Sequence, residues 1–349
     1  MLDDFWQRPI TDVGFVGPDA GGGGSYLLLP SGHVGGVPDG YRAFESRTNN
    51  VFVFRRAFIG GGDTETPVGL IEQTCIYPLI DADAPPDMTF PDGSAAAADM
   101  VFPQDYRYFE MLAEFVDREF VAVEDMAMRG MMASLGIVKG EPFEPGDRMR
   151  AIFSAGAEVG VKMAKAIRLG EYLSGTRYHD DRQWHNVFDV EFNEDTFLNV
   201  DARVGMFVIG YSISPAMVMN MVGKGSKYPF AYRDVSGDYP SGGRGYRLHL
   251  PAGVPAANLW SVTPYDADNA SGLDNGRPFP SIGSLDELVE NEDGSIDLYF
   301  GPEPPAGAPE PNWLRTVPGK GWFTVLRPYN PTEAFFDQSW RPDDFEPLG

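Results

Sequence analysis

Short apolar runs separated by turn residues fill the first hundred residues of the chain. The runs at 26–29, 41–44 and 51–58 are bounded by stretches rich in Gly and Pro. Such runs are typical of β-strands. Residues 82–102, rich in Asp, Pro and Ala, break the pattern and indicate an exposed connection. We therefore expect a β-rich domain over residues 1–100.

Hydrophobic residues at helical spacing come next and predict a helical connecting region over residues 101–190. Asp105 precedes the first set and can cap its helix. The second set contains several methionines, Met131 among them, which we interpret as core side chains; an adaptable ligand surface is the alternative. The third set predicts a helix of about six turns that ends near Leu169. The three sets fall at 108–116, 128–135 and 149–167.

Alternation of apolar and polar residues returns from about Asn199 onward. Segments 246–250, 296–300 and 323–329 alternate with the period of a strand, and clusters of Gly, Asn and Asp separate them. The intervening segments do not have the pattern of crossover helices, which disfavours parallel pairing. The chain is therefore predicted to be an α+β protein in which residues 191–349 form an antiparallel β-sandwich of the jelly-roll type.

Length and charge restrict the partners of the protein. A chain of 349 residues is long enough for two packed domains. The formal net charge of -24 repels nucleic acid and anionic membranes, so neither is an expected partner, whereas cations and basic ligands are easier to bind. The acidic residues are dispersed, which favours a solvated surface over a dedicated cation site. No stretch reaches the roughly 20 apolar residues of a membrane span.

Cysteine content and the first residues bear on the compartment. Cys75 is the only cysteine, so the chain cannot form an internal disulfide, and the apolar residues beside it predict a buried, inert thiol. The residues from Met1 to Trp6 have neither the basic nor the apolar region of a secretory signal. From the chain as it stands we expect a cytoplasmic protein.

Several motifs that would specify an activity are incomplete. The Gly-rich run at 21–25 leads into a predicted strand and lacks the Lys and Ser or Thr of a phosphate loop, so we interpret it as a turn. The sequence contains no Gly-x-Ser-x-Gly elbow and no His-Glu-x-x-His motif. The polar cluster from His179 to His185 has ligands for a hard cation, but we interpret it as a solvated connector.

Acidic and basic residues beside aromatic ones form the remaining candidate chemistry. They lie at expected strand ends or turns in the second half of the chain. Such a site can support general acid–base catalysis, because an arginine lowers the pKa of one carboxylate while burial raises that of another. Structural salt bridges produce the same pattern, so both interpretations stay open. The residues are Asp201, Asp234 and Asp266 with Arg203, Arg233 and Arg327.

Phrases along almost the whole chain resemble the paired bacterial domains of unknown function numbered 1254 and 1214. The amino-terminal phrases are Phe5-Trp-Gln-Arg-Pro, Gly17-Pro-Asp and Tyr26-Leu-Leu-Leu-Pro. The later ones include Leu135-Gly-Ile-Val-Lys-Gly, Asp201-Ala-Arg203, Leu259-Trp-Ser-Val-Thr-Pro-Tyr-Asp266, Asp297-Leu-Tyr-Phe-Gly-Pro, Pro318-Gly-Lys-Gly-Trp-Phe and Arg327-Pro-Tyr329. The resemblance implies β-rich domains joined by helices and supplies no settled reaction.

Proteins of this kind usually carry a long segment before the Phe5-Trp-Gln-Arg-Pro phrase, often with an export signal. The resemblance therefore implies a shortened first domain, and it leaves a periplasmic or secreted location open beside the cytoplasmic one. It also selects candidate site residues within or near the shared phrases. They are Asp201, Arg203 and Asp234 as catalytic candidates, and Tyr228, Trp260, Tyr265, Asp266, Arg327 and Tyr329 as substrate-binding candidates.

Our leading hypothesis from the sequence is a hydrolase for a polar small molecule, such as a phosphoanhydride or a glycoside, in a cleft between the domains. Asp201 and Asp234 would bind a Mg or Ca ion or act as acid and base, the arginines would orient an anionic group, and the aromatic residues would form a stacking wall. A non-catalytic module that binds a carbohydrate or another small ligand is one alternative. A homo-oligomeric assembly protein is another.

Overall fold

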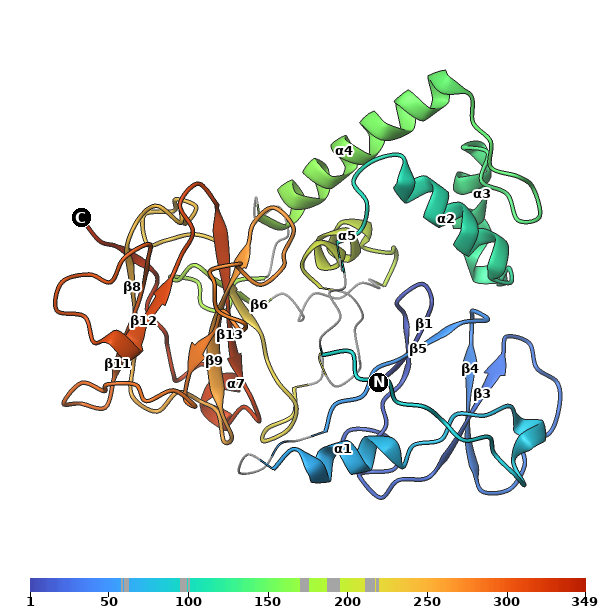
Figure 1. Cartoon of the computed structure of the whole chain (residues 1–349), viewed down its shortest axis with the longest axis horizontal. Coiled ribbons are helices and arrows are strands. Elements are labelled where there is room, and N and C mark those ends of the chain that lie inside the picture. The colour runs from blue at the N-terminus through green and yellow to red at the C-terminus, as the bar shows by residue number, and fades with distance from the viewer. Residues whose placement is uncertain are drawn as a thin grey trace. The chain divides into compact units, whose positions relative to one another are not determined.

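A computed structural model describes residues 1–57, 59, 63–94, 99, 101–169, 176–186, 195–210, 217 and 220–349 (Figure 1). They form two compact units, Met1–Phe153 and the described residues of 154–349, with the boundary inside a long helix. Helices and mainly antiparallel sheets together make the protein α+β, as predicted. The division of the chain at residues 100 and 190 stays a prediction.

The amino-terminal unit combines small sheets with helices. Its three-stranded antiparallel sheet has the order β2-β1-β5, and β3 and β4 form a parallel pair. The strands are β1 (Leu2–Asp4), β2 (Pro9–Thr11), β3 (Ser25–Pro30), β4 (Tyr41–Ser46) and β5 (Val51–Val53). The helices are α1 (Glu65–Glu72), η1 (Leu79–Asp81), α2 (Arg107–Arg118), η2 (Val123–Asp125), α3 (Met126–Ser134) and the start of α4 (Asp147–Leu169).

The three helices lie where the sequence predicts them, but their burial differs from the prediction. The helices α2, α3 and α4 match the three sets of helically spaced residues, and Asp105 accepts a hydrogen bond from the Arg107 amide at the start of α2. Met131 of α3 is 67% exposed, so the core interpretation is wrong for this residue. The buried position of α3 belongs to Arg129, whose guanidinium satisfies the carbonyl oxygens of Val116, Glu119 and Phe120.

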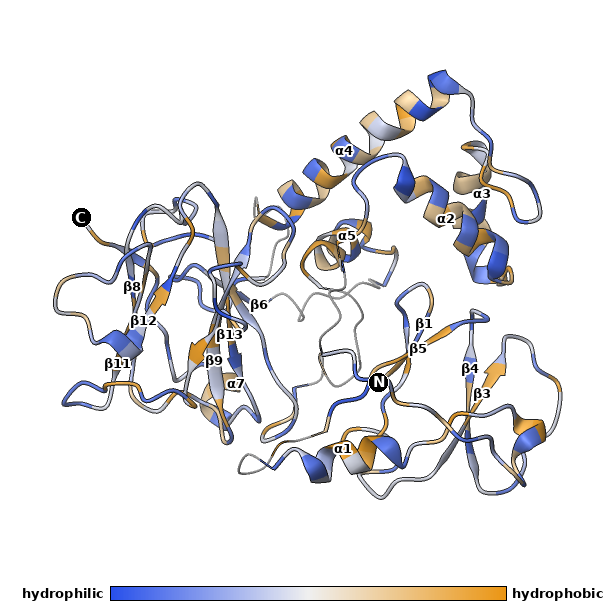
Figure 2. Ribbon diagram, in the orientation of Figure 1, coloured by the Kyte–Doolittle hydropathy of each residue, from blue (hydrophilic) through white to orange (hydrophobic). Residues whose placement is uncertain are grey.

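Two further expectations about exposure are corrected. Cys75 is exposed, because it lies in a loop after α1 and not in a buried strand. The predicted apolar face of α4 also carries exposed residues, such as Ile152 and Met163, and Figure 2 shows hydrophobic and hydrophilic residues interspersed along this helix. Within the described part of the chain, no helix has both the length and the apolar character needed to cross a membrane.

The carboxy-terminal unit contains the predicted β-sandwich. One sheet has the order β10-β9-β13-β7-β6 and is antiparallel throughout; the other has the order β12-β11-β8-β14 and is antiparallel except for β11 and β12. The strands are β6 (Trp184–Asn186), β7 (Pro229–Ala231), β8 (Tyr246–Leu250), β9 (Trp260–Asp266), β10 (Ile282–Gly283), β11 (Ile296–Gly301), β12 (Trp313–Arg315), β13 (Trp322–Pro328) and β14 (Glu346–Pro347). Its described helices are the end of α4, α5 (Val200–Ile209), η4 (Glu310–Asn312) and α7 (Glu333–Phe336).

Inward-facing residues of the two sheets form one hydrophobic core. Trp322 of β13 lies at its centre, with its ring 5.6 Å from that of Phe300 on β11 and 5.5 Å from that of Tyr246 on β8. Side chains such as Leu248 and Val262 are fully buried, and each stabilises the fold by about 2 kcal/mol relative to an exposed position. The alternation seen in the sequence thus places every second residue of these strands in the core.

Residues 200–209 form helix α5, although the sequence predicted only strands beyond Asn199. The Asn199 side chain accepts a hydrogen bond of 3.0 Å from the Ala202 amide and caps the helix. Ala202, Gly205 and Met206 then share one buried face. The apolar and β-branched residues of this segment are also common in strands, which explains the wrong prediction. The N-cap and the helical spacing of the buried residues favour a helix.

The cluster from His179 to His185 is part of the sandwich, so its interpretation as a solvated connector is wrong. Trp184 is fully buried in the core, and both histidines are buried. The Tyr178 amide donates to the Trp184 carbonyl at 2.8 Å, which folds the segment back on itself, and β6 pairs with β7. A three-residue strand is too short to show alternation in the sequence.

Candidate functional site

Two of the candidate carboxylates close local turns. The Oδ1 atom of Asp234 accepts the amides of Ser236 at 2.9 Å and Asp238 at 3.1 Å. Asp266 pairs with Lys320 and also accepts the Asp268 amide at 2.8 Å. Both residues are buried. These contacts are typical of aspartates that form turns. The Oδ2 atom of Asp234 is buried and has no hydrogen-bond partner in the part of the chain described here.

The other two catalytic candidates lie on α5. Asp201 occupies the first turn of the helix, where a carboxylate is stabilised by the helix dipole, and both Asp201 and Arg203 are exposed. Residues two apart on a helix do not face each other. Among the described residues, no hydrogen bond or ion pair joins Asp201, Arg203 and Asp234. Their catalytic role stays a prediction.

Four of the substrate-binding candidates come together on the outer face of the five-stranded sheet. The Arg327 guanidinium donates from Nη2 to the Tyr265 hydroxyl and lies 5.6 Å from the centre of the Tyr265 ring and 5.8 Å from that of the Tyr228 ring. The Tyr329 hydroxyl also hydrogen bonds to Arg327. Each of the four residues is partly exposed. We refer to Arg327, Tyr228, Tyr265 and Tyr329 as the Arg327 cluster.

Strand register explains this convergence. Arg327 lies on β13 opposite Ser261 of β9, and Tyr265 of β9 lies opposite Phe323. Odd-numbered residues of both strands therefore share the outer face, and the Tyr265 ring stacks on that of Phe323 at 5.4 Å. Trp260, with even parity, points into the sandwich core instead.

Among the described residues, the groups that hold the charge of Arg327 are neutral tyrosines. Burial disfavours the guanidinium charge, but the surrounding tyrosines outweigh it and raise the pKa of Arg327 above its ordinary value. Burial likewise raises the pKa of Tyr265, against the opposing charge of Arg327. Of the described residues, no carboxylate lies within ion-pair distance of Arg327, and its Nε atom is buried without a hydrogen-bond partner. An arginine without a nearby carboxylate is unexpected in this chain, because the sequence has 51 acidic residues and only 27 basic ones.

A row of aromatic rings continues the outer face away from the cluster, and no pattern in the sequence indicated it. Phe323 is 5.6 Å from Tyr232, which is 5.6 Å from His185 of β6. Arg168, in the last turn of α4, is buried beside the Tyr232 hydroxyl and donates from Nε to the Gly205 carbonyl of α5 at 3.1 Å. Burial raises the pKa of Tyr232, and the charge of Arg168 opposes that rise. The end of α4 and α5 therefore cover part of this face.

A metal centre has no support in the described geometry. Within the described ranges, no three His, Cys, Asp or Glu side chains come together in a way that would hold a metal ion. Asp181, in the cluster considered for a hard cation, forms ion pairs with Arg182 and Arg341. The Mg or Ca ion of the sequence hypothesis stays a prediction.

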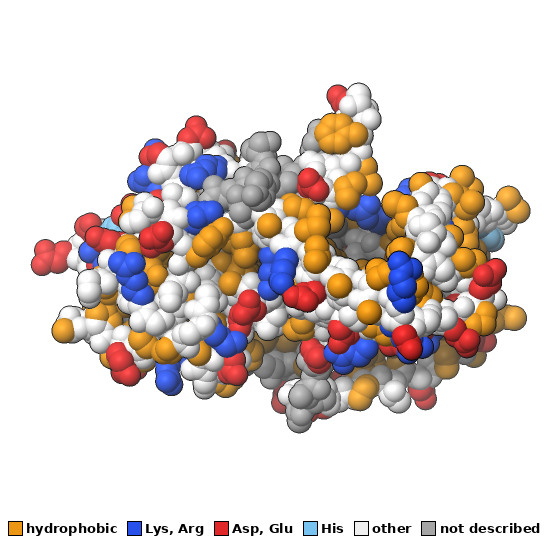
Figure 3. All heavy atoms as spheres, turned by 90° about the horizontal axis from the view of Figure 1, so that it is seen from above, with side chains coloured by type: hydrophobic (Ala, Val, Ile, Leu, Met, Phe, Trp, Pro, Cys, Tyr) orange, Lys and Arg blue, Asp and Glu red, His pale blue; other side chains and the backbone are white. Residues whose placement is uncertain are grey.

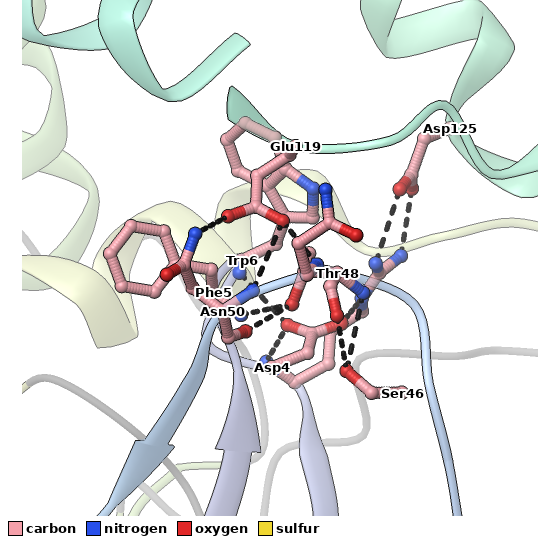
Figure 4. Close-up of polar contacts among 10 residues, drawn as sticks. Asp4, Phe5, Trp6, Ser46, Thr48, Asn50, Glu119 and Asp125 are labelled. Carbon is pink, nitrogen blue, oxygen red and sulfur yellow. Dashed lines mark hydrogen bonds and ion pairs between the residues drawn. The ribbon is translucent and has the colours of Figure 1, made fainter. Parts of the chain in front are cut away.

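The amino-terminal unit holds a second polar network, built around the Phe5-Trp-Gln-Arg-Pro phrase (Figure 4). Asp4 accepts the amides of Trp6 and Arg8, which closes the turn between β1 and β2. The Arg8 guanidinium binds Asp4 at 2.5 Å and Asp125 at 2.7 Å. Burial lowers the pKa of Arg8, but the hydrogen bonds that its guanidinium donates to Asp125 and Asp4 raise it above its ordinary value.

Glu119 completes this network from the end of α2. The carboxylate is fully buried and accepts the Asn49 amide and the Asn50 side chain, each at 2.5 Å. Figure 4 shows Glu119 and Asp125 meeting the loop around Thr48 and the β1 turn from the helical side. Phe5 packs edge-on against Phe115 at 5.0 Å. Since these carboxylates already accept hydrogen bonds from the protein, we interpret the network as a structural contact between the sheet and the helices and not as a ligand site.

The Gly-rich loop also contains its own anion. The buried Asp19 carboxylate accepts the amides of Gly14 at 2.7 Å and Gly23 at 3.0 Å and the Tyr26 hydroxyl at 2.6 Å. These backbone donors are the groups that a phosphate would use. The turn interpretation of residues 21–25 fits this arrangement, because a side chain of the loop already occupies the donors.

The candidate residues divide by their place in the family matches. Residues 225–333 match DUF1214, a protein of unknown function, and residues 1–78 match DUF1254, also of unknown function. All four residues of the Arg327 cluster lie within the first range, whereas Asp201 and Arg203 lie outside both.

Solved structures and curated proteins add little beyond these families. The VPA0106 protein from Vibrio parahaemolyticus is similar over 94% of this chain and 77% of its own, with 16% identity and a TM-score of 0.48. An uncharacterized protein from Burkholderia cenocepacia is similar over 64% of this chain and 49% of its own, with 13% identity and a TM-score of 0.29. Comparison with curated proteins gives no match. The two matched regions, in the predicted order, confirm the resemblance seen in the sequence: residues 1–78 match DUF1254 and residues 225–333 match DUF1214.

Proposed function

We propose that the carboxy-terminal unit binds an anionic small molecule at the Arg327 cluster. The observation that carries the proposal is a mostly buried guanidinium that contacts three tyrosines and, among the described residues, no carboxylate. Taking such a charge out of water is costly unless an opposite charge comes close. A carboxylate or phosphate would supply it, and charge-assisted hydrogen bonds are about twice as strong as neutral ones.

The tyrosines suit this role. Their hydroxyls can donate to an anion while their rings hold the guanidinium in place. The partial exposure of all four residues gives a small ligand a route to the charge. The proposal follows the binding-module alternative from the sequence, with an anion as the ligand class.

Titration calorimetry with acetate and inorganic phosphate tests the site. We expect Arg327→Gln to weaken anion binding about 10- to 100-fold, because it removes a mostly desolvated charge partner. Arg327→Lys keeps the charge but not the planar fork and should retain part of the affinity. Arg315→Gln, at an exposed position on β12, is the matched control and should bind like the wild type. Equal binding by the wild type and a folded Arg327→Gln variant would refute the proposal.

The hydrolase hypothesis from the sequence makes a separate demand. It requires turnover of a phosphate ester, a polyphosphate or a glycoside, with or without Mg²⁺ or Ca²⁺, and a loss of that turnover in Asp201→Asn. If substrate panels show turnover that depends on Asp201, the ligand of the Arg327 cluster becomes a substrate. Turnover unchanged by Asp201→Asn removes the basis of the hydrolase assignment.

A further inference from the structure

A hollow of about 350 Å³ is lined by residues of β9 and β10 and of the loops beside them, among them Ser261, which lies opposite Arg327 in the β9–β13 ladder. Two of its lining residues are small, Ser261 of β9 and Gly283 of β10, and they lie opposite each other in the β9–β10 ladder. Leu259, Phe279 and Leu285 line its sides. The hollow is within the 300–1,000 Å³ range typical of small-ligand sites.

Strand pairing connects the hollow to the cluster. Ser261 lies directly across from Arg327 in the β9–β13 ladder. The next residues on the same face repeat the arrangement, since the Tyr329 amide donates to the Leu259 carbonyl at 2.8 Å. Directly opposed side chains have Cβ atoms about 4.5–5.5 Å apart. One side of β9 therefore joins an apolar hollow, and the other side joins a guanidinium with no counter-charge in the described part of the chain.

Two apolar side chains that line the hollow are exposed, and none of the described residues of the unit covers them. Phe279 is 83% exposed and Leu285 is 82% exposed, although both are large apolar residues. Arg277 and Asp286 also line the hollow, and their opposite charges leave it with no net charge. Two exposed apolar side chains flanking an uncharged hollow are suited to an apolar group, and not to a second charged one.

We propose that the ligand is amphipathic: an aliphatic carboxylate of medium chain length, with its head group at Arg327 and its hydrocarbon chain in the hollow between Phe279 and Leu285. This inference rests on the proposed anion site and names its ligand class. Full burial of a methylene contributes about 0.8 kcal/mol, or about a fourfold gain in affinity. Because Phe279 and Leu285 are themselves mostly exposed and bury a methylene only in part, we expect about a twofold gain per methylene.

The test compares straight-chain carboxylates from acetate to decanoate, below their micelle-forming concentrations, by titration calorimetry with the full chain. In the wild type we expect affinity to rise with chain length. Phe279→Ser combined with Leu285→Ser should flatten that rise and leave acetate binding unchanged. Both positions are exposed, so the variant should fold like the wild type. Ile80→Ser, at a 91% exposed position of the amino-terminal unit, is the control for surface polarity and should keep the rise.

The head group is tested separately from the chain. Arg327→Gln should lower the affinity for every chain length by the same factor, and a decyl trimethylammonium ion, with a similar tail and the opposite charge, should not compete. Binding that depends on Arg327 but not on chain length overturns the amphipathic ligand and keeps the anion site. A chain-length effect that survives Phe279→Ser with Leu285→Ser also overturns the hollow as its location. Binding that Arg327→Gln leaves unchanged at all lengths overturns both proposals.

Discussion

Asp19 shows how one carboxylate sets the conformation of a loop that the sequence describes only as flexible. Burial favours its neutral form, but hydrogen bonds from Tyr26, Gly14 and Gly23 hold the pKa of Asp19 below its ordinary value. In turn, burial and the contact with Asp19 raise the pKa of Tyr26 to about 12. The bond between them thus has its full strength only when Asp19 is ionised and Tyr26 is protonated.

The two shifts predict a pH window for the stability that this bond supplies. Because the pKa of Asp19 is lowered on folding, its ionised form stabilises the fold at pH values above its unfolded pKa, near 4. This stability is lost as the pH falls through the folded pKa. Because the pKa of Tyr26 is raised on folding, its protonated form stabilises the fold at pH values below its unfolded pKa of 10.0. This stability is lost as the pH rises to about 12. Asp19→Asn should therefore cost about 1 kcal/mol at pH 7 and less at pH 2 and pH 12.

Urea denaturation of the wild type and Asp19→Asn at the three pH values checks this window. Asp39→Asn, an exposed carboxylate in a nearby loop, is the control and should cost little at any pH. A cost for Asp19→Asn that stays constant from pH 2 to pH 12 would contradict the assigned hydrogen bonds.

The sequence located the Arg327 cluster better than it located the catalytic candidates. Alternation predicted that Phe323, Val325, Arg327 and Tyr329 share a face, and the register then brought Tyr265 to Arg327. Asp234 and Asp266 instead accept hydrogen bonds in turns from amides two to four residues away. Aspartate commonly closes its own turn, which is the local signal that could have separated these two from a site.

At the scale of elements, length decided what could be predicted. The long alternating strands β8, β11 and β13 and the helix α4 were visible because a period repeats within each. Strands of three residues, such as β6 and β7, contain too few positions for a period. Helix α5 was missed because its apolar residues suit either structure, and its burial is decided by contacts with the rest of the unit.

The attachment of α5 gives the prediction at this scale. Arg168 joins the end of α4 to α5 through the Gly205 carbonyl and lies beside the Tyr232 hydroxyl. Arg168→Met keeps most of the side-chain volume and removes both contacts, which should cost about 2 kcal/mol because it leaves buried groups unsatisfied. Hydrogen exchange should accelerate in residues 200–209 while β8 and β11 stay protected. Lys162→Met, exposed on the same helix, is the control. Unchanged exchange in α5 would show that Arg168 does not hold it.

For the whole molecule, the division into two compact units makes a claim about cooperativity. Each unit has its own interior: the network of Glu119 and Arg8 in the first, and the core around Trp322 in the second. Figure 3 shows acidic and basic side chains scattered among each other on the face in view, so the net charge of -24 is not gathered there in one patch. Units with separate interiors are expected to unfold as separate transitions.

A pair of matched variants tests this independence. Glu119→Gln should destabilise the amino-terminal unit by about 2 kcal/mol, since a buried carboxylate loses charge-assisted hydrogen bonds. Leu248→Ala should destabilise the sandwich by about 3 kcal/mol through the cavity that it leaves.

Hydrogen exchange at increasing urea concentration reports each unit through its own peptides. We expect Glu119→Gln to lower the midpoint only for peptides of residues 1–153, and Leu248→Ala only for those of 220–349. Glu114→Gln, an exposed partner of Arg118, should shift neither, because surface ion pairs contribute little. If either buried substitution moves both midpoints by the same amount, the two units unfold as one, and the local networks stabilise the molecule as a whole.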